Sequence, residues 1–599
     1  MTTTPDTPAV DPGPPVEAET NKLKLAWWHW ALLLEPPLVT VALVMNSLRE
    51  FDLNELYFTY STYYVLFSMV ALYVGVLITG KGTQVSLGQW FVENRFGIAL
   101  ALAIAAVVLG SVAPGFRVLS DEANLVGVSK NLFFQKTANF ATTGKWYFEN
   151  YWNLNLTIDR RPALFPFLVS LLHSIRGYHP ENAFHLNAII FTLFIFSAYR
   201  LGKLLGGELF GLTAAILAAA EANTLLAARS AGFDLLSSFM ILMVIKSFVE
   251  YTIESTPKRL ALLSLNLCVL AHVRYEGWAL LVGAVSVLLV FRLVRASQIR
   301  AYAALYAFIP TFLAPRYWQM VAKAEDTEQP MSASLFSFSH LVQNVRDYVS
   351  LALKPFDTEA VHSPWLIILA VGGIGLFVWS VVRRPYDWKL SSVNLRRLVF
   401  VLALLGLETI IAFSYSWGMP LHPAASRLFI WLDTFVAFCA AWLLVVISRR
   451  MRPWVTLLGR SSGAPMAVLV SLALFVMQIP TASEGRFTND LHLTRQALRT
   501  WDYFSRLGTK NILILTDRPG LYTIMNYGAL DIAAARSNRD PLNELSRKLY
   551  TDIYLIQEVD LATGKPGKEF DVWSDVPKET VCEFQNSDNG LVRIARVKH

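Results

Sequence analysis

Long apolar runs separated by short polar stretches fill the chain from about residue 26 to about residue 480. A helix needs about 20 apolar residues to cross a bilayer, and about 13 runs approach that length. They lie near residues 26–46, 57–79, 96–113, 182–204, 209–228, 232–253, 258–273, 276–294, 299–317, 364–382, 397–417, 427–448 and 463–480. The pattern predicts an α-helical polytopic membrane protein with about 13 transmembrane helices.

The apolar run 162–175 is shorter than these and ends in a polar stretch. If it is re-entrant or interfacial rather than spanning, the basic clusters between helices all fall on one side of the membrane, as the positive-inside bias requires for the cytoplasmic side. These clusters are Arg200/Lys203, Lys258/Arg259, Arg292/Arg295/Arg300, Arg383/Arg384/Lys389/Arg396 and Arg449/Arg450/Arg452/Arg460. We therefore expect a multi-pass protein of the cell (cytoplasmic or inner) membrane, with a cytoplasmic N-terminus and an extracytoplasmic C-terminal region.

This pattern divides the chain into four regions. Residues 1–20 are rich in Pro, Thr and acid and predict a disordered tail. Residues 21–95 hold two additional N-terminal helices, and 96–482 form the transmembrane core, with a first external loop at 114–181 and an outer loop at 319–363. Residues 483–599 have the composition of a soluble α/β domain, which we interpret as a lid or an acceptor-docking domain. Its expected elements are helices at 491–507, 521–527 and 541–550 and strands at 511–516, 552–558 and 591–597.

The composition agrees with a membrane protein. Of 599 residues, 54% are hydrophobic and only 16% are charged, which is more apolar surface than a soluble fold of this size buries. The net charge of +7 does not indicate nucleic-acid binding, because the basic residues sit in short clusters beside apolar segments. The three cysteines form neither a disulfide framework nor a CxxC metal site, and the C-terminal region lacks a phosphate-loop motif.

Charges of both signs gather at several corners that this topology places outside. They are Asp121/Glu122, Asp159/Arg160/Arg161, Arg229/Asp234, Arg274/Glu276 and the corner from Tyr415 to Arg427. Charges at a membrane boundary are costly unless they are paired, hydrated or functional. Their concentration on one side predicts a polar reaction chamber at the membrane surface.

Four stretches, in order, carry a resemblance to a known family. They are Asp121-Glu122-Ala123, Asp159-Arg160-Arg161-Pro162-Ala163-Leu164, the run from Phe184-His185-Leu186-Asn187 through Tyr199-Arg200-Leu201-Gly202 to Leu209-Phe210-Gly211, and Ala228-Arg229-Ser230-Ala231-Gly232-Phe233-Asp234-Leu235-Leu236. Over about 96–300 the chain resembles the GT-C membrane glycosyltransferases, near the lipid A aminoarabinose transferases and the protein O-mannosyltransferases. Ala163 departs from that pattern, which has a second proline there, and His185 stands where an arginine is usual.

The resemblance implies transfer of a sugar from a polyprenyl-phosphate donor to an extracytoplasmic acceptor, a cell-envelope glycan, a lipid or a protein, with inversion. Such a transfer needs a base for the acceptor hydroxyl and cations for the leaving phosphate. We expect Asp121 to be the base, with a pKa raised by the low-dielectric boundary and by Glu122. The alternative is that this acidic pair caps the following helix. Glu122 would orient Asp121 or bind a divalent metal ion, but no tight ligand spacing supports a metal, so no cofactor is assigned.

The arginines are the expected ligands of the donor phosphate. Arg160 and Arg161 offer the forked geometry that phosphate prefers, although they would also suit lipid headgroups. Arg229 and Arg274 join them, and structural ion pairs with Asp234 and Glu276 are the alternative for these two. Asp159, Asp234, Glu276 and Arg427 are expected to support the site. The lone His340 and His362 are expected to bind neither acceptor nor metal.

Other interpretations remain open. The aromatic run from Trp146 to Trp152 suits either stacking on sugar rings or an interfacial belt. A transporter or flippase of lipid-linked saccharide is an alternative from another class, although the chain shows no internal repeat and its charges crowd one boundary. A catalytically inactive scaffold of the same fold is a second alternative, which the Ala163 departure leaves open.

Overall fold

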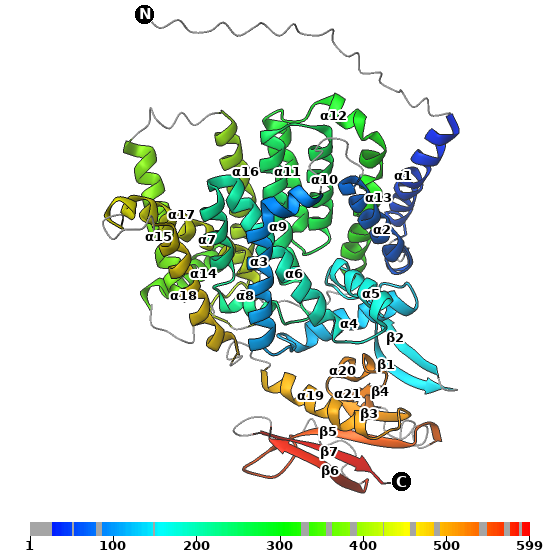
Figure 1. Ribbon diagram of the computed structural model, residues 1–599. Coiled ribbons are helices and arrows are strands. Elements are labelled where there is room, and N and C mark those ends of the chain that lie inside the picture. Colours follow the sequence, from blue (N-terminus) through cyan, green and yellow to red (C-terminus); the bar gives the residue numbers. More distant parts are fainter. Residues whose placement is uncertain are drawn as a thin grey trace, which may run out of the picture.

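The protein is a bundle of helices with a β-sheet layer at one end, and the chain runs from the bundle into the sheet (Figure 1). The computed structural model describes residues 27–50, 53–78, 87–147, 150–324, 335–354, 362–383, 392–422, 424–455, 463–483, 491–537, 548–567, 576–585 and 590–598. The expected tail at 1–20 lies outside these residues, as does most of the expected helix at 541–550.

The apolar runs predicted to form helices are largely helical, although the runs at 209–228 and 299–317 are each divided between two helices. The bundle consists of α1 (Trp27–Ser47), α2 (Leu53–Ile78), α3 (Leu87–Ser111), α6 (Asn182–Gly206), α7 (Glu208–Ala218), α8 (Ala222–Ala227), α9 (Asp234–Ile253), α10 (Pro257–Ala271), α11 (Gly277–Val290), α12 (Ala296–Ala301), α13 (Ala303–Ala324), α14 (Phe338–Ser350), α15 (Pro364–Arg383), α16 (Ser392–Ser414), α17 (Ile430–Val455) and α18 (Gly463–Ser483), with 3₁₀ turns η1 (Leu351–Leu353) and η2 (Ser426–Phe429). Within the described residues, seven helices are long and apolar enough to cross a membrane.

Two details of the bundle bear on the site. The run predicted as one helix at 209–228 is broken into α7 and α8, because Glu221 leaves helical geometry with φ −129° and ψ 122°. The short apolar run before Arg176 forms α5 (Leu164–Arg176), whose 13 residues extend about 20 Å. That is less than the roughly 30 Å hydrocarbon core, so α5 is too short to span it upright.

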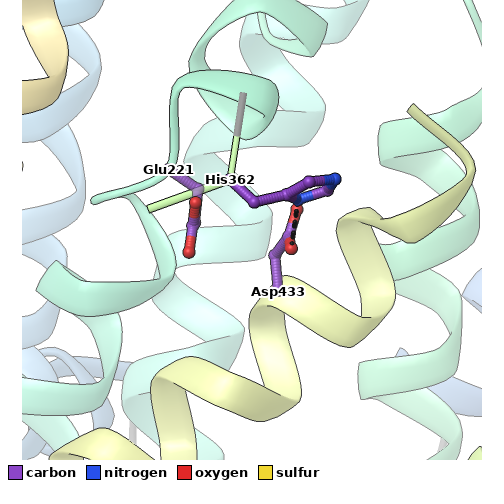
Figure 2. Close-up of side chains that lie close together, drawn as sticks. All are labelled: Glu221, His362 and Asp433. Carbon is purple, nitrogen blue, oxygen red and sulfur yellow. Dashed lines mark hydrogen bonds and ion pairs between the residues drawn. The ribbon is translucent and has the colours of Figure 1, made fainter. Parts of the chain in front are cut away.

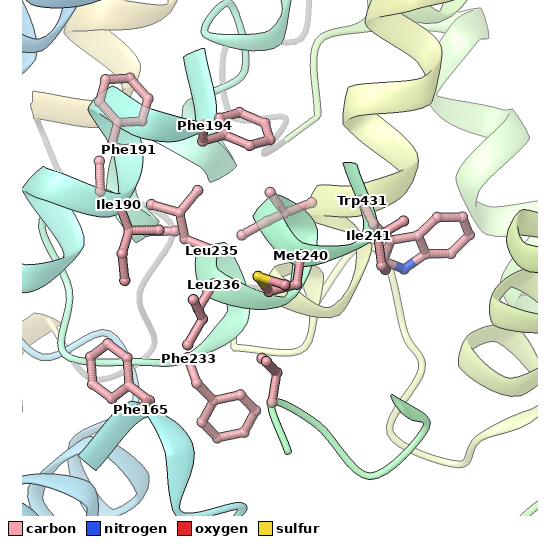
Figure 3. Packing of buried hydrophobic residues seen from close by; sticks show 14 of the residues in the cluster. Phe165, Ile190, Phe191, Phe194, Phe233, Leu235, Leu236, Met240, Ile241 and Trp431 are labelled. Carbon is pink, nitrogen blue, oxygen red and sulfur yellow. The ribbon is translucent and has the colours of Figure 1, made fainter. Parts of the chain in front are cut away.

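Buried aromatic and aliphatic side chains hold the bundle together. Phe191 and Phe194 of α6 pack near Leu235 and Met240 of α9, with Trp431 of α17 on the other side of α9 (Figure 3). These helices begin or end at the sheet-side end of the bundle, so this packing fixes the relative positions of the polar residues at their ends. The basic segment around α12 lies at the opposite end (Figure 1).

The sheet has seven strands in the order β2-β1-β4-β3-β5-β7-β6. Its members are β1 (Phe140–Tyr147), β2 (Asn150–Thr157), β3 (Ile512–Thr516), β4 (Gly528–Asp531), β5 (Asp552–Asp560), β6 (Lys578–Gln585) and β7 (Gly590–Val597), accompanied by α19 (Leu491–Arg506), α20 (Gly520–Thr523) and α21 (Ile532–Ser537). β3 pairs in parallel with β4 and β5, and the other pairings are antiparallel. The strands expected at 511–516, 552–558 and 591–597 are β3, β5 and β7.

The hairpin β1–β2 comes from the first external loop, yet it extends the C-terminal sheet. Gly144 of β1 is paired with Ala529 of β4. The aromatic run explains why, because Trp146 Nε1 donates to the carbonyl of Asn526 at 2.5 Å and the Tyr151 hydroxyl donates to that of Tyr527 at 2.9 Å. Trp146 and Tyr151 therefore anchor the C-terminal region to the loop, which neither interpretation of this run anticipated.

The loop also contributes a helix to this junction. α4 (Leu119–Phe134) is buried along much of its length, and its Lys130 donates to the carbonyl of Thr523 at 2.6 Å. The Lys130 ammonium also lies 4.0 Å from the centre of the Tyr151 ring. This contact packs the C-terminal region against the helix whose first turn holds the acidic pair Asp121/Glu122.

Candidate active site

Six ion pairs link seven side chains at the sheet-side end of the bundle into a chain of alternating charge. In order, the residues are Asp159, Arg161, Asp121, Arg427, Asp234, Arg274 and Glu276. The sequence predicted every one of these residues as part of the site, and the structure brings them all together. We call them the charge chain.

Each member lies at the end of a helix, where the backbone turns. Asp121 is in the first turn of α4, and Asp234 is the first residue of α9. Arg161 precedes α5, Arg274 and Glu276 lie in the turn between α10 and α11, and Arg427 belongs to η2 just before α17. Packing of the apolar helices therefore brings charged residues from distant parts of the sequence to one place.

Asp121 stands at the centre of the charge chain. One carboxylate oxygen pairs with Arg161, and the other lies 2.5 Å from Arg427 Nη2. Burial by itself would raise the pKa of Asp121, but Arg427 and Arg161 outweigh it and hold the pKa below the ordinary value for aspartate. The expectation of a raised pKa for Asp121 is therefore wrong, because it considered the low-dielectric boundary without the two cations.

Glu122, in contrast, is buried, and its carboxylate accepts hydrogen bonds from backbone amides. Its Oε2 accepts from the amides of Arg117 at 3.1 Å and Ala231 at 2.8 Å, and Oε1 accepts from that of Val118 at 3.4 Å. Burial raises the pKa of Glu122 to about 7. Since Val118 is the N-cap of α4, the helix-capping alternative describes Glu122, while Asp121 faces the arginines.

The turn that delivers Asp234 is tied down by the same carboxylate. Asn187 Nδ2 donates to the carbonyls of Ser230 at 2.7 Å and Gly232 at 2.8 Å, while Glu122 accepts from the Ala231 amide between them. A Cβ on Gly232 would lie 3.2 Å from carboxylate oxygens of both Glu122 and Asp234. The absence of a side chain there lets the two carboxylates approach this backbone closely.

Arg161 is held from three sides. Its Nη1 lies 2.8 Å from Asp159 Oδ1, and the same oxygen accepts from the Arg161 amide at 2.9 Å. Gln319 of α13 donates to the carbonyls of Asp159 at 2.9 Å and Arg161 at 2.7 Å. Arg316 fixes that amide by donating to Gln319 Oε1 at 2.6 Å. Arg161 is therefore pre-oriented, with a side chain 21% exposed.

The other end of the charge chain is more enclosed. Arg274 is buried between Asp234, at 2.5 Å, and Glu276, as the predicted Arg274–Glu276 pair requires. Asp234 also lies 3.6 Å from Arg427. The alternative pairing of Asp234 with Arg229 is wrong, because Arg229 Nε instead donates to the carbonyl of Val112 at 2.9 Å.

Two of the predicted phosphate ligands lie outside the charge chain. The side chain of Arg160 is exposed, and Arg229 braces the end of α3 through Val112. Arg161 and Arg427 are left as the arginines that are both paired with Asp121 and partly accessible, with 21% and 14% of their side chains exposed. These two can present N–H donors to an anion without leaving the site.

Sequence reasoning missed three residues around the charge chain. Gln319 and Arg316 lie in an apolar helix, and a polar pair in such a helix was the signal available. Arg117 is buried, and its guanidinium donates to the Asn223 carbonyl at 3.3 Å and to the Ser426 hydroxyl at 3.0 Å. Burial lowers the pKa of Arg117 to about 10.

Among the described residues, the side chains grouped so that they could hold a metal lie apart from the acidic pair Asp121/Glu122. Glu221, His362 and Asp433 come together in a buried cluster, with one ligand atom of each within 4.8 Å of the others (Figure 2). The expectation that His362 stands alone is wrong, because its Nδ1 lies 2.7 Å from Asp433 Oδ1. Metal binding was one of two alternatives for Glu122 in the sequence, and the structure shows its oxygens accepting from backbone amides.

No profile of a known protein family matches the chain, and no curated protein matches it in sequence. Several solved structures are similar to it at low sequence identity. ArnT from Cupriavidus metallidurans bound to undecaprenyl phosphate is 12% identical, with a TM-score of 0.42, and the match covers 85% of this chain and 98% of that one. The apo oligosaccharyltransferase of Archaeoglobus fulgidus is 11% identical, with a TM-score of 0.43 and coverages of 77% and 69%.

A third similar structure is the arabinofuranosyltransferase AftD from Mycobacteria. It is 14% identical, with a TM-score of 0.45, and the match covers 84% of this chain but only 40% of AftD. The helices and the C-terminal strands of the described residues agree with the predicted polytopic helical fold carrying a C-terminal sheet. Because every one of these TM-scores is below 0.5, the similarities do not identify the donor, the acceptor or the mechanism of this chain.

Proposed function

We propose that this protein is an integral membrane glycosyltransferase that moves a sugar from a polyprenyl-phosphate donor to an extracytoplasmic acceptor hydroxyl. The observation that carries the proposal is the position of Asp121, whose two carboxylate oxygens are each paired with a partly exposed arginine, Arg161 and Arg427. A potential base beside two cations is what transfer from a phosphate leaving group needs. The motif resemblance from Asp121 to Leu236 agrees with it.

Arg161 and Arg427 are the proposed ligands of the donor phosphate. Guanidinium groups bind phosphate oxygens in pairs and stabilise the charge that grows on the phosphate as its bond to the sugar breaks. Asp159 and Gln319 fix the position of Arg161, while Asp234 lies behind Arg427. The cations would thus be held in place before the donor arrives.

The pairing of Asp121 gives the site a switch that depends on the donor. A phosphate bound to Arg161 and Arg427 competes with the carboxylate for the same N–H donors. Loss of these pairings leaves the burial effect on Asp121 uncompensated, so its pKa rises toward the range useful for a base. Asp121 would therefore become basic only when the donor is bound.

The proposed reaction is a single displacement at the anomeric carbon of the sugar. Asp121 accepts the proton of the acceptor hydroxyl, and the acceptor oxygen bonds to the anomeric carbon on the face opposite the phosphate. The bond between that carbon and the phosphate oxygen breaks, and its electron pair leaves on the polyprenyl phosphate, which Arg161 and Arg427 neutralise. Attack opposite the leaving group inverts the anomeric configuration.

The C-terminal sheet is proposed to act in docking the acceptor or covering the site. Its β3–α20 segment lies against α4, since Gly520 is close enough to Asn124 for a Cβ to lie 3.6 Å from the Asn124 side-chain oxygen. The sheet would therefore contact the acceptor or restrict its access to the site beside Asp121. We place this end of the bundle outside the cell membrane, as the basic clusters at the other end favour.

The proposal can be tested with the polyprenyl phosphate that remains after the sugar has been transferred. Its binding can be measured whichever sugar the donor carries. The purified full-length protein in detergent is titrated with undecaprenyl phosphate and, as a control, with uncharged undecaprenol. We expect tighter binding of the phosphate, weakened at least tenfold in Arg161→Ala and Arg427→Ala and retained in Asp121→Asn. Equal binding of both lipids, or arginine variants that bind like wild type, would contradict the assignment.

A further inference from the structure

A second cluster of ionisable groups, separate from the charge chain, joins three segments of the bundle. Glu221 comes from the break between α7 and α8, His362 from the turn before α15, and Asp433 from the first turn of α17 (Figure 2). All three side chains are at most 1% exposed. The cluster lies at helix ends, as the charge chain does, but it plays no part in the proposed sugar transfer.

The cluster holds more acceptor atoms than the described residues satisfy. Glu221 Oε2 accepts from the Ser363 amide at 2.7 Å, whereas Oε1 is buried with no hydrogen-bond partner. The Ser363 hydroxyl is also buried and unpaired. A buried polar atom without a partner destabilises the folded state, so these atoms point to a group that the protein chain does not supply.

The charge of the cluster is also uncompensated. Two carboxylates are buried there, and within the described part of the chain their one ion-pair partner is His362, on Asp433. Arg117 is close by, but its guanidinium donates to Asn223 and Ser426. A divalent cation would neutralise both carboxylates at once.

We propose that Glu221, His362 and Asp433 bind one divalent transition-metal ion of the zinc class. One imidazole nitrogen with two carboxylate oxygens suits Zn²⁺ better than Ca²⁺ or Mg²⁺, which prefer oxygen ligands alone. Tetrahedral Zn²⁺ separates its ligand atoms by about 3.4 Å. The widest pair, within 4.8 Å, would close, and the 2.7 Å contact between His362 Nδ1 and Asp433 Oδ1 would open slightly.

The ion would have a structural consequence for the proposed phosphate site. Asn223 Nδ2 donates both to Asp433 Oδ2 at 3.0 Å and to the Ser426 carbonyl at 2.9 Å. Ser426 is the neighbour of Arg427 in η2. A metal that ties Asp433 to Glu221 and His362 would thus hold the segment that presents Arg427, which is a positioning role and not a chemical one.

Metal content tests this inference directly and does not require activity. The full-length protein is purified without nickel resin, exposed to Zn²⁺, passed through gel filtration and analysed by mass spectrometry for metals. We expect about one zinc ion per chain in wild type, and at least tenfold less in Asp433→Asn and His362→Phe. Phenylalanine preserves the ring that packs against Tyr348 and Phe429.

Two variants serve as matched controls. Asp502→Asn removes an exposed carboxylate and His179→Gln an exposed imidazole, so both should keep the zinc of wild type. If the cluster variants fail to fold, wild type is stripped with a chelator instead, and its Tm should fall and recover when Zn²⁺ is restored. Wild type that takes up no zinc, or cluster variants that keep it, would overturn the proposal in favour of protonated carboxylates.

Discussion

Arg427 Nη2 lies 2.5 Å from Asp121 Oδ2, although 306 positions separate the two residues in sequence. The contact joins the start of α4 to the segment before α17, and with Arg161 on the other oxygen it makes the resting carboxylate a poor base. The proposed base and the proposed phosphate ligands therefore inactivate one another until a donor separates them. Mutation should therefore separate the role of Asp121 in turnover from the role of Arg161 and Arg427 in donor binding.

Replacing Asp121 by Asn should abolish turnover but not donor binding. The amide cannot accept the proton of the acceptor hydroxyl, so we expect kcat to fall by about 10²–10⁴-fold. Loss of the competing negative charge leaves Arg161 and Arg427 available, so affinity for polyprenyl phosphate should stay the same or rise. Steady-state kinetics and lipid titration on one preparation measure both effects. Turnover equal to that of the Asp502→Asn control would remove Asp121 from the mechanism.

The neighbouring arginines should respond differently to a conservative change. Arg161 bridges Asp121 and Asp159, and lysine cannot reproduce that fork, so Arg161→Lys should raise the KM for the donor by about 10–100-fold. Arg160→Lys, at an exposed side chain, should change it less than about threefold. Kinetics at fixed acceptor concentration distinguish them. A larger increase in the KM for the donor in Arg160→Lys than in Arg161→Lys would favour Arg160 as the phosphate ligand.

Glu122 predicts a pH dependence of stability with a definite sign. Its pKa is raised to about 7 by burial, so between pH 4.5 and 7 the folded state binds more protons than the unfolded state. The contribution of Glu122 to the free energy of unfolding is therefore fully present below the pKa of Glu122 in the unfolded state. It declines as the pH rises to about 7, by at most about 3 kcal/mol. Because glutamine does not titrate, the Tm of Glu122→Gln should fall less between pH 5 and 7.5 than the Tm of wild type does.

Parallel pH profiles of Tm measured by differential scanning fluorimetry check this prediction. Glu122→Gln is expected to start less stable at pH 5, because one of its backbone donors then faces an amide NH₂ group, and to approach wild type as the pH rises. Profiles that remain parallel would mean that Glu122 is ionised in the folded state throughout this range.

Much of the helical architecture and the membership of the charge chain could be predicted from the sequence. Each apolar run is long enough to specify a helix, and charges at the ends of such helices are costly without a role, which singled out Asp121, Arg161 and Arg274. Their pairing could not be predicted. Whether Asp234 meets Arg229 or Arg427 depends on how the helices pack, and that packing reversed the expected pKa shift of Asp121.

The cluster of Glu221, His362 and Asp433 and the sheet shared by the loop and the C-terminal region were not predicted, for related reasons. Glu221 and Asp433 each stand inside an apolar run, and a buried acid in such a run was the available signal. The alternating polar and aromatic residues around Trp146 and Tyr151 are typical of strands, but their partner β4 lies more than 350 positions away and is only four residues long. Long-range partners of that kind are set by tertiary packing.

Docking of the hairpin to the C-terminal sheet should depend on Gly144. A Cβ there would fall 1.9 Å from the Tyr151 hydroxyl, so Gly144→Ala must displace the ring that donates to Tyr527. We expect a loss of about 1–3 kcal/mol and faster amide exchange in β1 and β4, with the helices unchanged. Hydrogen exchange by mass spectrometry locates the effect. Gly110→Ala, which meets no atom within 4 Å, is the control, and equal exchange in both variants would contradict the docking role.

The central claim is that Asp121 and its two arginines transfer a sugar from a polyprenyl phosphate. The most direct test is mass spectrometry of membrane lipids from cells that lack the protein, complemented with wild type or with Asp121→Asn. We predict that a polyprenyl-monophosphate sugar accumulates in the deletion and in the Asp121→Asn cells but not with wild type, and its mass would identify the donor. Lipid profiles that are the same in all three strains would contradict the account and favour a transporter or an inactive scaffold.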